Sequence, residues 1–183
     1  MRFSLIVIDG FYSDIDAMRA TALGMEFNVE GNYPGRRSAP YRHDGIRAAI
    51  EKAVQEPITY WDCPYNGAFQ IAMARDQTWV HADDTTTWGG VLFMTPDAPI
   101  ISGTAFYRHR ATGLERRPTD SELRLRCDRD GVDRTRWDAV DHVGNVYNRL
   151  VLFDSARFHA SETYFGQSLE DGRLFQTFFF STG

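Results

Sequence analysis

The chain has 183 residues, of which 43% are hydrophobic and 25% are charged, and its net charge is −5. This length is enough for one domain with a core that needs no disulfides, and the acidic balance argues against nucleic-acid binding. Cys63 and Cys127 lack metal-ligand spacing, so we expect free thiols. The apolar start at residues 5–8 is too short for a signal segment or a membrane span, which favours a cytoplasmic protein without membrane association.

Residues 1–57 predict a short strand at 5–8 followed by two helices. Asp14 is typical of a helix N-terminus, and Gly24 ends this first helix. Asp44 is the expected cap of the second helix. Its apolar residues recur at helical spacing and predict a face that packs on the core: Ile46, Ala49, Ile50, Ala53 and Val54.

From residue 58 onward the hydrophobic period changes from helical to alternating. Strands are predicted at residues 69–73, 78–84, 88–95, 104–110, 148–153, 158–162 and 174–181. Many short strands separated by turns are typical of a jelly roll, also called a double-stranded β-helix. We therefore expect a single domain over residues 1–183, mainly β, with the N-terminal helices packed on the barrel.

Two segments are predicted to be loops. Arg36 and Arg37 follow the turn signal Asn32-Tyr33-Pro34-Gly35 and are expected in an arginine-bearing loop. Residues 111–140 carry many charges of both signs and predict a solvated insertion between strands. A lid or a partner-binding face is the alternative, because long loops often carry function.

His81 and Asp83 lie two positions apart in the predicted strand at 78–84. Alternate side chains of a strand point to the same face, so these two would project together. Two imidazoles and one carboxylate, with neighbouring positions left open, are the ligand set of a non-haem Fe(II) centre. His159, in the predicted strand at 158–162, would supply the third ligand from across the barrel.

Arg173 follows His159 near the C-terminus and offers a planar, bidentate partner for an acid cosubstrate. Gln70, on the strand before the His-x-Asp motif, is a second candidate for contact with the cosubstrate. His109 and His142 are rival metal ligands. We rank them lower because neither is followed by an arginine on a terminal strand.

The order His81-Ala82-Asp83, a long gap, His159 and then Arg173 resembles the iron(II)/2-oxoglutarate-dependent oxygenase superfamily. Several segments look more specifically like an uncharacterised bacterial and phage branch of it. Within residues 11–180 these segments are Tyr33-Pro34-Gly35 and residues 79–84, 103–109, 148–153 and 172–176.

The resemblance implies that His81, Asp83 and His159 are the catalytic iron ligands and that Arg173 binds the distal carboxylate of 2-oxoglutarate. It implies an oxidoreductase that uses dioxygen to hydroxylate a small-molecule, amino-acid or peptide substrate and releases succinate and carbon dioxide. Some members carry a serine two residues after the arginine, where this chain has Phe175. Halogenating members lack the carboxylate ligand, so Asp83 favours hydroxylation.

Two other functions are compatible with these residues. One is a non-catalytic jelly-roll binding module that uses residues 111–140 as its partner surface. The other is a cupin-type metal enzyme that does not use 2-oxoglutarate, in which Arg173 would serve packing or the substrate. The prime substrate and the oligomeric state stay open.

Overall fold

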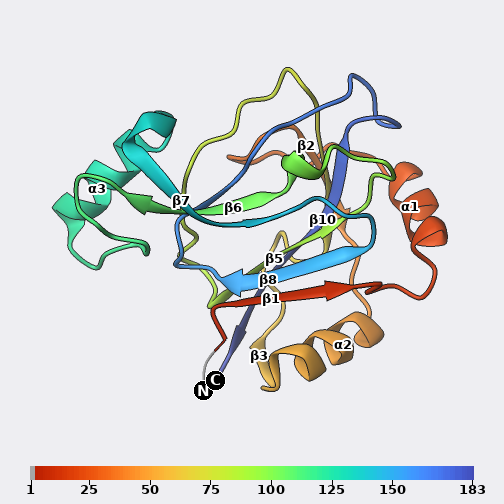
Figure 1. Ribbon diagram of the computed structural model, residues 1–183. Coiled ribbons are helices and arrows are strands. Elements are labelled where there is room, and N and C mark those ends of the chain that lie inside the picture. Colours follow the sequence, from red (N-terminus) through yellow and green to blue (C-terminus); the bar gives the residue numbers. More distant parts are fainter. Residues whose placement is uncertain (1–2) are drawn as a thin grey trace.

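The computed structural model describes residues 3–183, which form two antiparallel sheets with helices around them (Figure 1). The larger sheet runs in the order β1 (Leu5–Asp9), β8 (Arg149–Asp154), β5 (Trp88–Phe93), β10 (Arg173–Thr182), β4 (Ala68–Ala72) and β2 (Arg36–Pro40), and β3 (Ile58–Tyr60) pairs with β10. The smaller sheet has the order β7 (Trp137–Val143), β6 (Thr104–His109) and β9 (His159–Ser161). The predicted jelly roll is confirmed.

The larger sheet is covered on both faces. On β8, Leu150 and Leu152 pack in the same cluster as residues of the N-terminal helices, whereas Val151 and Phe153 pack with Phe106 of the smaller sheet. This alternation follows from the period of two in a strand. The strand predicted at 69–73 corresponds to β4. It was expected to be half-buried, but all of its residues are buried because the sheet is covered on both faces.

Helices α1 (Ile15–Leu23) and α2 (Asp44–Val54) form where the sequence predicts them. The carboxylate of Asp14 caps α1 by accepting a hydrogen bond from the first turn, and Gly24 follows the last residue. The cap of α2 is His43 rather than the predicted Asp44, because the His43 Nδ1 accepts from a backbone amide of the first turn. The buried face of α2 is Ile46, Ile50 and Val54, while Ala49 is exposed.

The strand predicted at residues 78–84 does not form as a regular strand. Its backbone amides donate to three different parts of the chain: Val80 to Gly131, His81 to His159 and Asp83 to Ser155. Only the His81–His159 pair is a β-bridge. The segment is therefore extended but does not pair continuously with one neighbouring strand. The sequence pattern is the same for such a segment and for a regular strand.

Both predicted loops contain regular structure. Arg36 and Arg37 belong to β2, which pairs with β4. Residues 111–140 include α3 (Ser121–Asp130) and the start of β7. Most of their side chains are exposed or half-buried, as expected for a solvated insertion, but the segment contains a helix that was not predicted. Helix α3 escaped prediction because its one buried residue is Cys127, which leaves almost no apolar period to detect.

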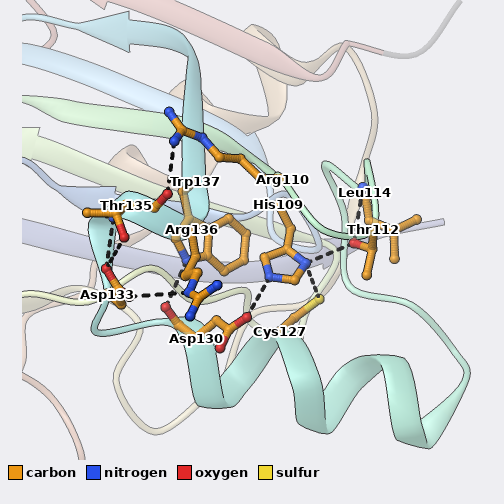
Figure 2. Close-up of polar contacts among 10 residues, drawn as sticks. All are labelled: His109, Arg110, Thr112, Leu114, Cys127, Asp130, Asp133, Thr135, Arg136 and Trp137. Atoms are coloured by element: carbon orange, nitrogen blue, oxygen red, sulfur yellow. Dashed lines mark hydrogen bonds and ion pairs between the residues drawn. The ribbon is translucent and has the colours of Figure 1, made fainter.

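His109, at the end of β6, ties α3 to the smaller sheet (Figure 2). The ring is fully buried, with Nε2 3.0 Å from an Asp130 carboxylate oxygen and Nδ1 2.9 Å from the Thr112 hydroxyl. The indole N–H of Trp137 donates to the backbone carbonyl of Asp130 at 3.0 Å. Because both ring nitrogens are engaged, His109 is not free to bind a metal.

Cys63 and Cys127 are both free, buried thiols, as predicted. Within residues 3–183, no helix has the length and apolar character needed to cross a membrane.

Candidate active site

His81, Asp83 and His159 meet between the two sheets. Each offers one ligand atom, and these atoms all lie within 4.8 Å of one another. The Nε2 atom of His159 is 3.7 Å from a carboxylate oxygen of Asp83, and the two imidazole centroids are 4.5 Å apart. Two histidines and one carboxylate at this spacing can hold one metal ion, and the donor set suits non-haem iron.

Both histidines are oriented by the backbone. The Nδ1–H of His81 donates to the carbonyl of Trp79 at 3.1 Å, and that of His159 donates to the carbonyl of Arg157 at 2.8 Å. In this tautomer the Nε2 lone pair of each ring is free for a metal. Burial, and secondarily the neighbouring His81, lowers the pKa of His159 to about 4, so its ring is neutral at pH 7 and able to ligate.

The triad lines a cavity of about 710 Å³, a size that suits a small-molecule site. Its wall comes from both sheets, from the loops at 32–34 and 78–85, and from α3. Its lining includes the side chains of Arg37, Gln70, Thr104, Tyr164, Phe175 and Phe179.

Arg173 opens β10, and its side chain is completely buried. Its Nε donates to the carbonyl of Ser102 at 2.8 Å, and one terminal nitrogen donates to that of Gly103 at 3.3 Å. The other terminal nitrogen, Nη1, is buried and has no hydrogen-bond partner among the described residues. A buried cationic donor without a partner is unfavourable, and a carboxylate would satisfy it.

Thr104 carries a second buried polar atom without a partner in residues 3–183, its hydroxyl oxygen. Thr104 follows Gly103, whose carbonyl accepts from Arg173, and it lines the cavity. Arg173 itself is not part of the lining. Phe175 and Tyr164 do line the cavity, and their ring centroids lie 4.5 Å and 5.7 Å from the guanidinium carbon of Arg173. Thr104 was not predicted as a site residue, although it lies at the start of the strand predicted at residues 104–110.

Gln70 lines the cavity, and both ends of its amide are engaged. Its oxygen accepts from Arg37 Nε at 2.6 Å, and its nitrogen donates to the carbonyl of Pro34 at 2.7 Å. Gln70 therefore orients Arg37, and its contact with a cosubstrate stays a prediction. The rival ligand His142 is exposed on β7, with Nε2 3.4 Å from the carbonyl of Ile101.

Charged pairs surround the side of the cavity nearest α3. The carboxylate of Asp84 is 2.8 Å from Arg117 Nη1 and also pairs with Arg124, so it is not an acceptor for a ligand histidine. Arg117 also pairs with Asp128 of α3 at 3.3 Å. The segment at 111–140 thus contributes to the wall of the site.

No protein-family model and no curated protein sequence matches this chain. Among solved structures, HygX from Streptomyces hygroscopicus, crystallised with nickel and 2-oxoglutarate, matches with a TM-score of 0.65 at 12% identity over 95% of this chain and 81% of that one. SnoK, a non-haem α-ketoglutarate-dependent carbocyclase from nogalamycin biosynthesis, gives a TM-score of 0.59 at 14% identity over 95% and 78%. A Trichoplax adhaerens prolyl hydroxylase gives 0.51 at 11% identity over 97% and 83%. These likenesses show that the chain has the jelly-roll fold of 2-oxoglutarate-dependent oxygenases.

Proposed function

We propose that this protein is an Fe(II)/2-oxoglutarate-dependent dioxygenase. The observation that carries the proposal is the combination, inside one barrel, of a His81–Asp83–His159 triad and a buried Arg173 donor that has no hydrogen-bond partner within residues 3–183. The triad fits the metal, and the donor fits the distal carboxylate of the cosubstrate. Thr104 is the second candidate donor to that carboxylate.

Three protein ligands leave neighbouring coordination positions open for the cosubstrate and dioxygen. The bound iron and 2-oxoglutarate would supply the oxidation of a C–H bond, with succinate and carbon dioxide as products. The chain would supply the two imidazoles and the Asp83 carboxylate, which lowers the net charge of the metal centre, and Phe153 is one of the apolar residues of the cavity wall.

The substrate class and the reaction outcome are part of this proposal. Asp83 supplies the carboxylate ligand that halogenating members of the superfamily lack, and this favours hydroxylation over halogenation. HygX has been crystallised with hygromycin B and the prolyl hydroxylase with a peptide fragment, which supports a small-molecule or peptide substrate. The cytoplasmic location stays a prediction from the sequence.

The direct test is metal-dependent binding of 2-oxoglutarate, measured by calorimetry on apo protein and on Ni(II)-loaded protein. We expect one 2-oxoglutarate per chain when the metal is present and no comparable binding without it. Asp83→Ala should not hold the metal, so adding Ni(II) should no longer promote 2-oxoglutarate binding. Asp84→Ala is the matched control, since that carboxylate pairs with arginines, and it should bind like the wild type. Binding of 2-oxoglutarate that ignores both the metal and Asp83 would refute the assignment.

A further inference from the structure

Arg37 is a buried cation whose terminal nitrogens are free. Its side chain is 8% exposed, and it lines the same cavity as the triad. Its Nε donates to Gln70, but its two terminal nitrogens have no hydrogen bond or ion pair with any residue in the part of the chain described. The charge of Asp83 attracts the Arg37 guanidinium, but no hydrogen bond or ion pair joins the two side chains in the described residues, so the terminal nitrogens remain available to a ligand.

The guanidinium is held in a fixed orientation. Arg37 and Gln70 are direct partners across β2 and β4, and the Gln70 amide is itself fixed by the carbonyl of Pro34. Three aromatic rings lie near the guanidinium carbon, with their centroids at 3.9 Å for Tyr33, 5.0 Å for Tyr65 and 5.6 Å for Phe179. With Nε bonded and the faces against rings, only the edge with the two terminal nitrogens is left for a ligand.

A guanidinium edge of this kind matches the two oxygens of a carboxylate. The single positive charge of Arg37 matches a ligand group with one negative charge. Burial lowers the pKa of Arg37 to about 10, so the group is still a cation at pH 7. The other arginines on the cavity wall, Arg117 and Arg124, are already paired with Asp84. A dianion would therefore lack a second free cation here.

Under the proposed function, 2-oxoglutarate does not need Arg37. One end of that molecule would bind the metal held by the triad, and Arg173 and Thr104 offer donors for its distal carboxylate. Arg37 is therefore left for the second molecule that must enter the cavity, the prime substrate.

We propose that Arg37 determines substrate specificity by binding a carboxylate of the prime substrate, which makes the substrate an organic acid. This inference rests on the proposed function. The rings of Tyr33, Tyr65 and Phe179 form an apolar surround next to the carboxylate and favour an acid with a flat or apolar body. Gln70 is a positioning residue for Arg37.

The test compares an acid with its neutral amide on the full chain loaded with Ni(II) and 2-oxoglutarate. Phenylacetate and phenylacetamide are the probes, and their dissociation constants are measured by ligand-observed NMR. In the wild type we expect phenylacetate to bind at least about tenfold more tightly than the amide. Arg37→Gln should bring the two within about twofold of each other, because the charged edge is gone.

Two further variants make the result specific. Arg36→Gln removes the same charge from the adjacent, exposed residue of β2 and should keep the wild-type preference. Arg37→Lys keeps the buried charge but cannot form a bidentate pair with a carboxylate, and we expect a reduced preference for the acid. It also provides a folded variant if Arg37→Gln does not fold.

Three results would overturn the proposal: an acid preference that survives in Arg37→Gln, no binding of phenylacetate to the wild type up to about 10 mM, or a tenfold loss of 2-oxoglutarate affinity in Arg37→Gln. The last result would assign Arg37 to the cosubstrate instead. Failure of the proposed function is a separate observation, since it would appear as wild-type protein that does not bind 2-oxoglutarate with the metal present.

Discussion

Among the described residues, Arg173 and Thr104 each carry a buried polar atom without a hydrogen-bond partner. The other terminal nitrogen of Arg173 donates to the carbonyl of Gly103, the residue before Thr104. We predict that Arg173→Met weakens 2-oxoglutarate binding about tenfold to hundredfold, since a hydrogen bond to a charged group contributes about 1.5–3 kcal/mol. Thr104→Val, which removes only a hydroxyl, should weaken binding a few-fold. Calorimetry on Ni(II)-loaded variants measures both effects. Arg36→Met is the control, and unchanged affinity in Arg173→Met would remove Arg173 from this role.

At this scale the sequence correctly predicts that His81, Asp83 and His159 come together, but not how the residues around them are buried. His81 and Asp83, two residues apart in an extended segment, reach the same site, whereas Val80 and Ala82 pack in a hydrophobic cluster with Cys127 of α3. Arg37 was not distinguished from surface arginines, because its burial comes from the pairing of β2 with β4 and from rings distant in the sequence, such as Phe179.

At the scale of elements, the anchoring of α3 depends on His109. We predict that His109→Leu lowers the free energy of unfolding by about 1–3 kcal/mol, because Asp130 and Thr112 each lose a hydrogen-bond partner. Urea denaturation measures this loss, and faster hydrogen exchange over residues 121–130 should accompany it. His142→Leu is the matched control at an exposed position. Equal stability of the two variants would contradict the anchoring role.

The turn before β2 depends on Gly35. Its φ is +72°, and a Cβ there would lie 2.0 Å from the backbone carbonyl oxygen of Ile71 in β4. Gly113 has a similar φ of +71° but open space around its Cβ position. We predict that Gly113→Ala costs about 1 kcal/mol for the left-handed backbone alone. Gly35→Ala should cost clearly more, because β2 must move away from β4.

Thermal denaturation of the two alanine variants provides the comparison. Since Arg37 lies two residues after Gly35, the Gly35→Ala variant should also lose its preference for phenylacetate over the amide. Equal melting temperatures for the two variants would show that β2 tolerates the displacement without cost.

Strands with a clear apolar run were predicted, and elements fixed by distant contacts were not. Both faces of β5 and β8 are buried, so each strand is a short, almost continuous apolar run that is visible in its own sequence. Residues 78–84 lack a continuous ladder because their amides bond to three separate segments. Helix α3 is held by His109 and Trp137 from other elements, so its own residues do not show that it is structured.

At the scale of the whole molecule, the triad joins the extended segment at 78–84 to β9, so a bound metal should stabilise the barrel. At a metal concentration 100 times the dissociation constant, binding adds about 2.7 kcal/mol to stability. For a chain of this size we predict a rise in Tm of about 5–10 °C with Ni(II). Differential scanning fluorimetry measures the rise. It should be absent in Asp83→Ala, and a similar rise in that variant would indicate binding elsewhere.

The most direct test of the central claim is the fate of 2-oxoglutarate when dioxygen is admitted. The protein is loaded anaerobically with Fe(II) and 2-oxoglutarate, exposed to oxygen, and assayed for succinate and consumed dioxygen. We predict succinate in equal amount to the dioxygen consumed, at no less than one per iron, and none from Asp83→Ala. Recovery of intact 2-oxoglutarate from a complex that holds both iron and 2-oxoglutarate would contradict the assignment as a 2-oxoglutarate-dependent dioxygenase.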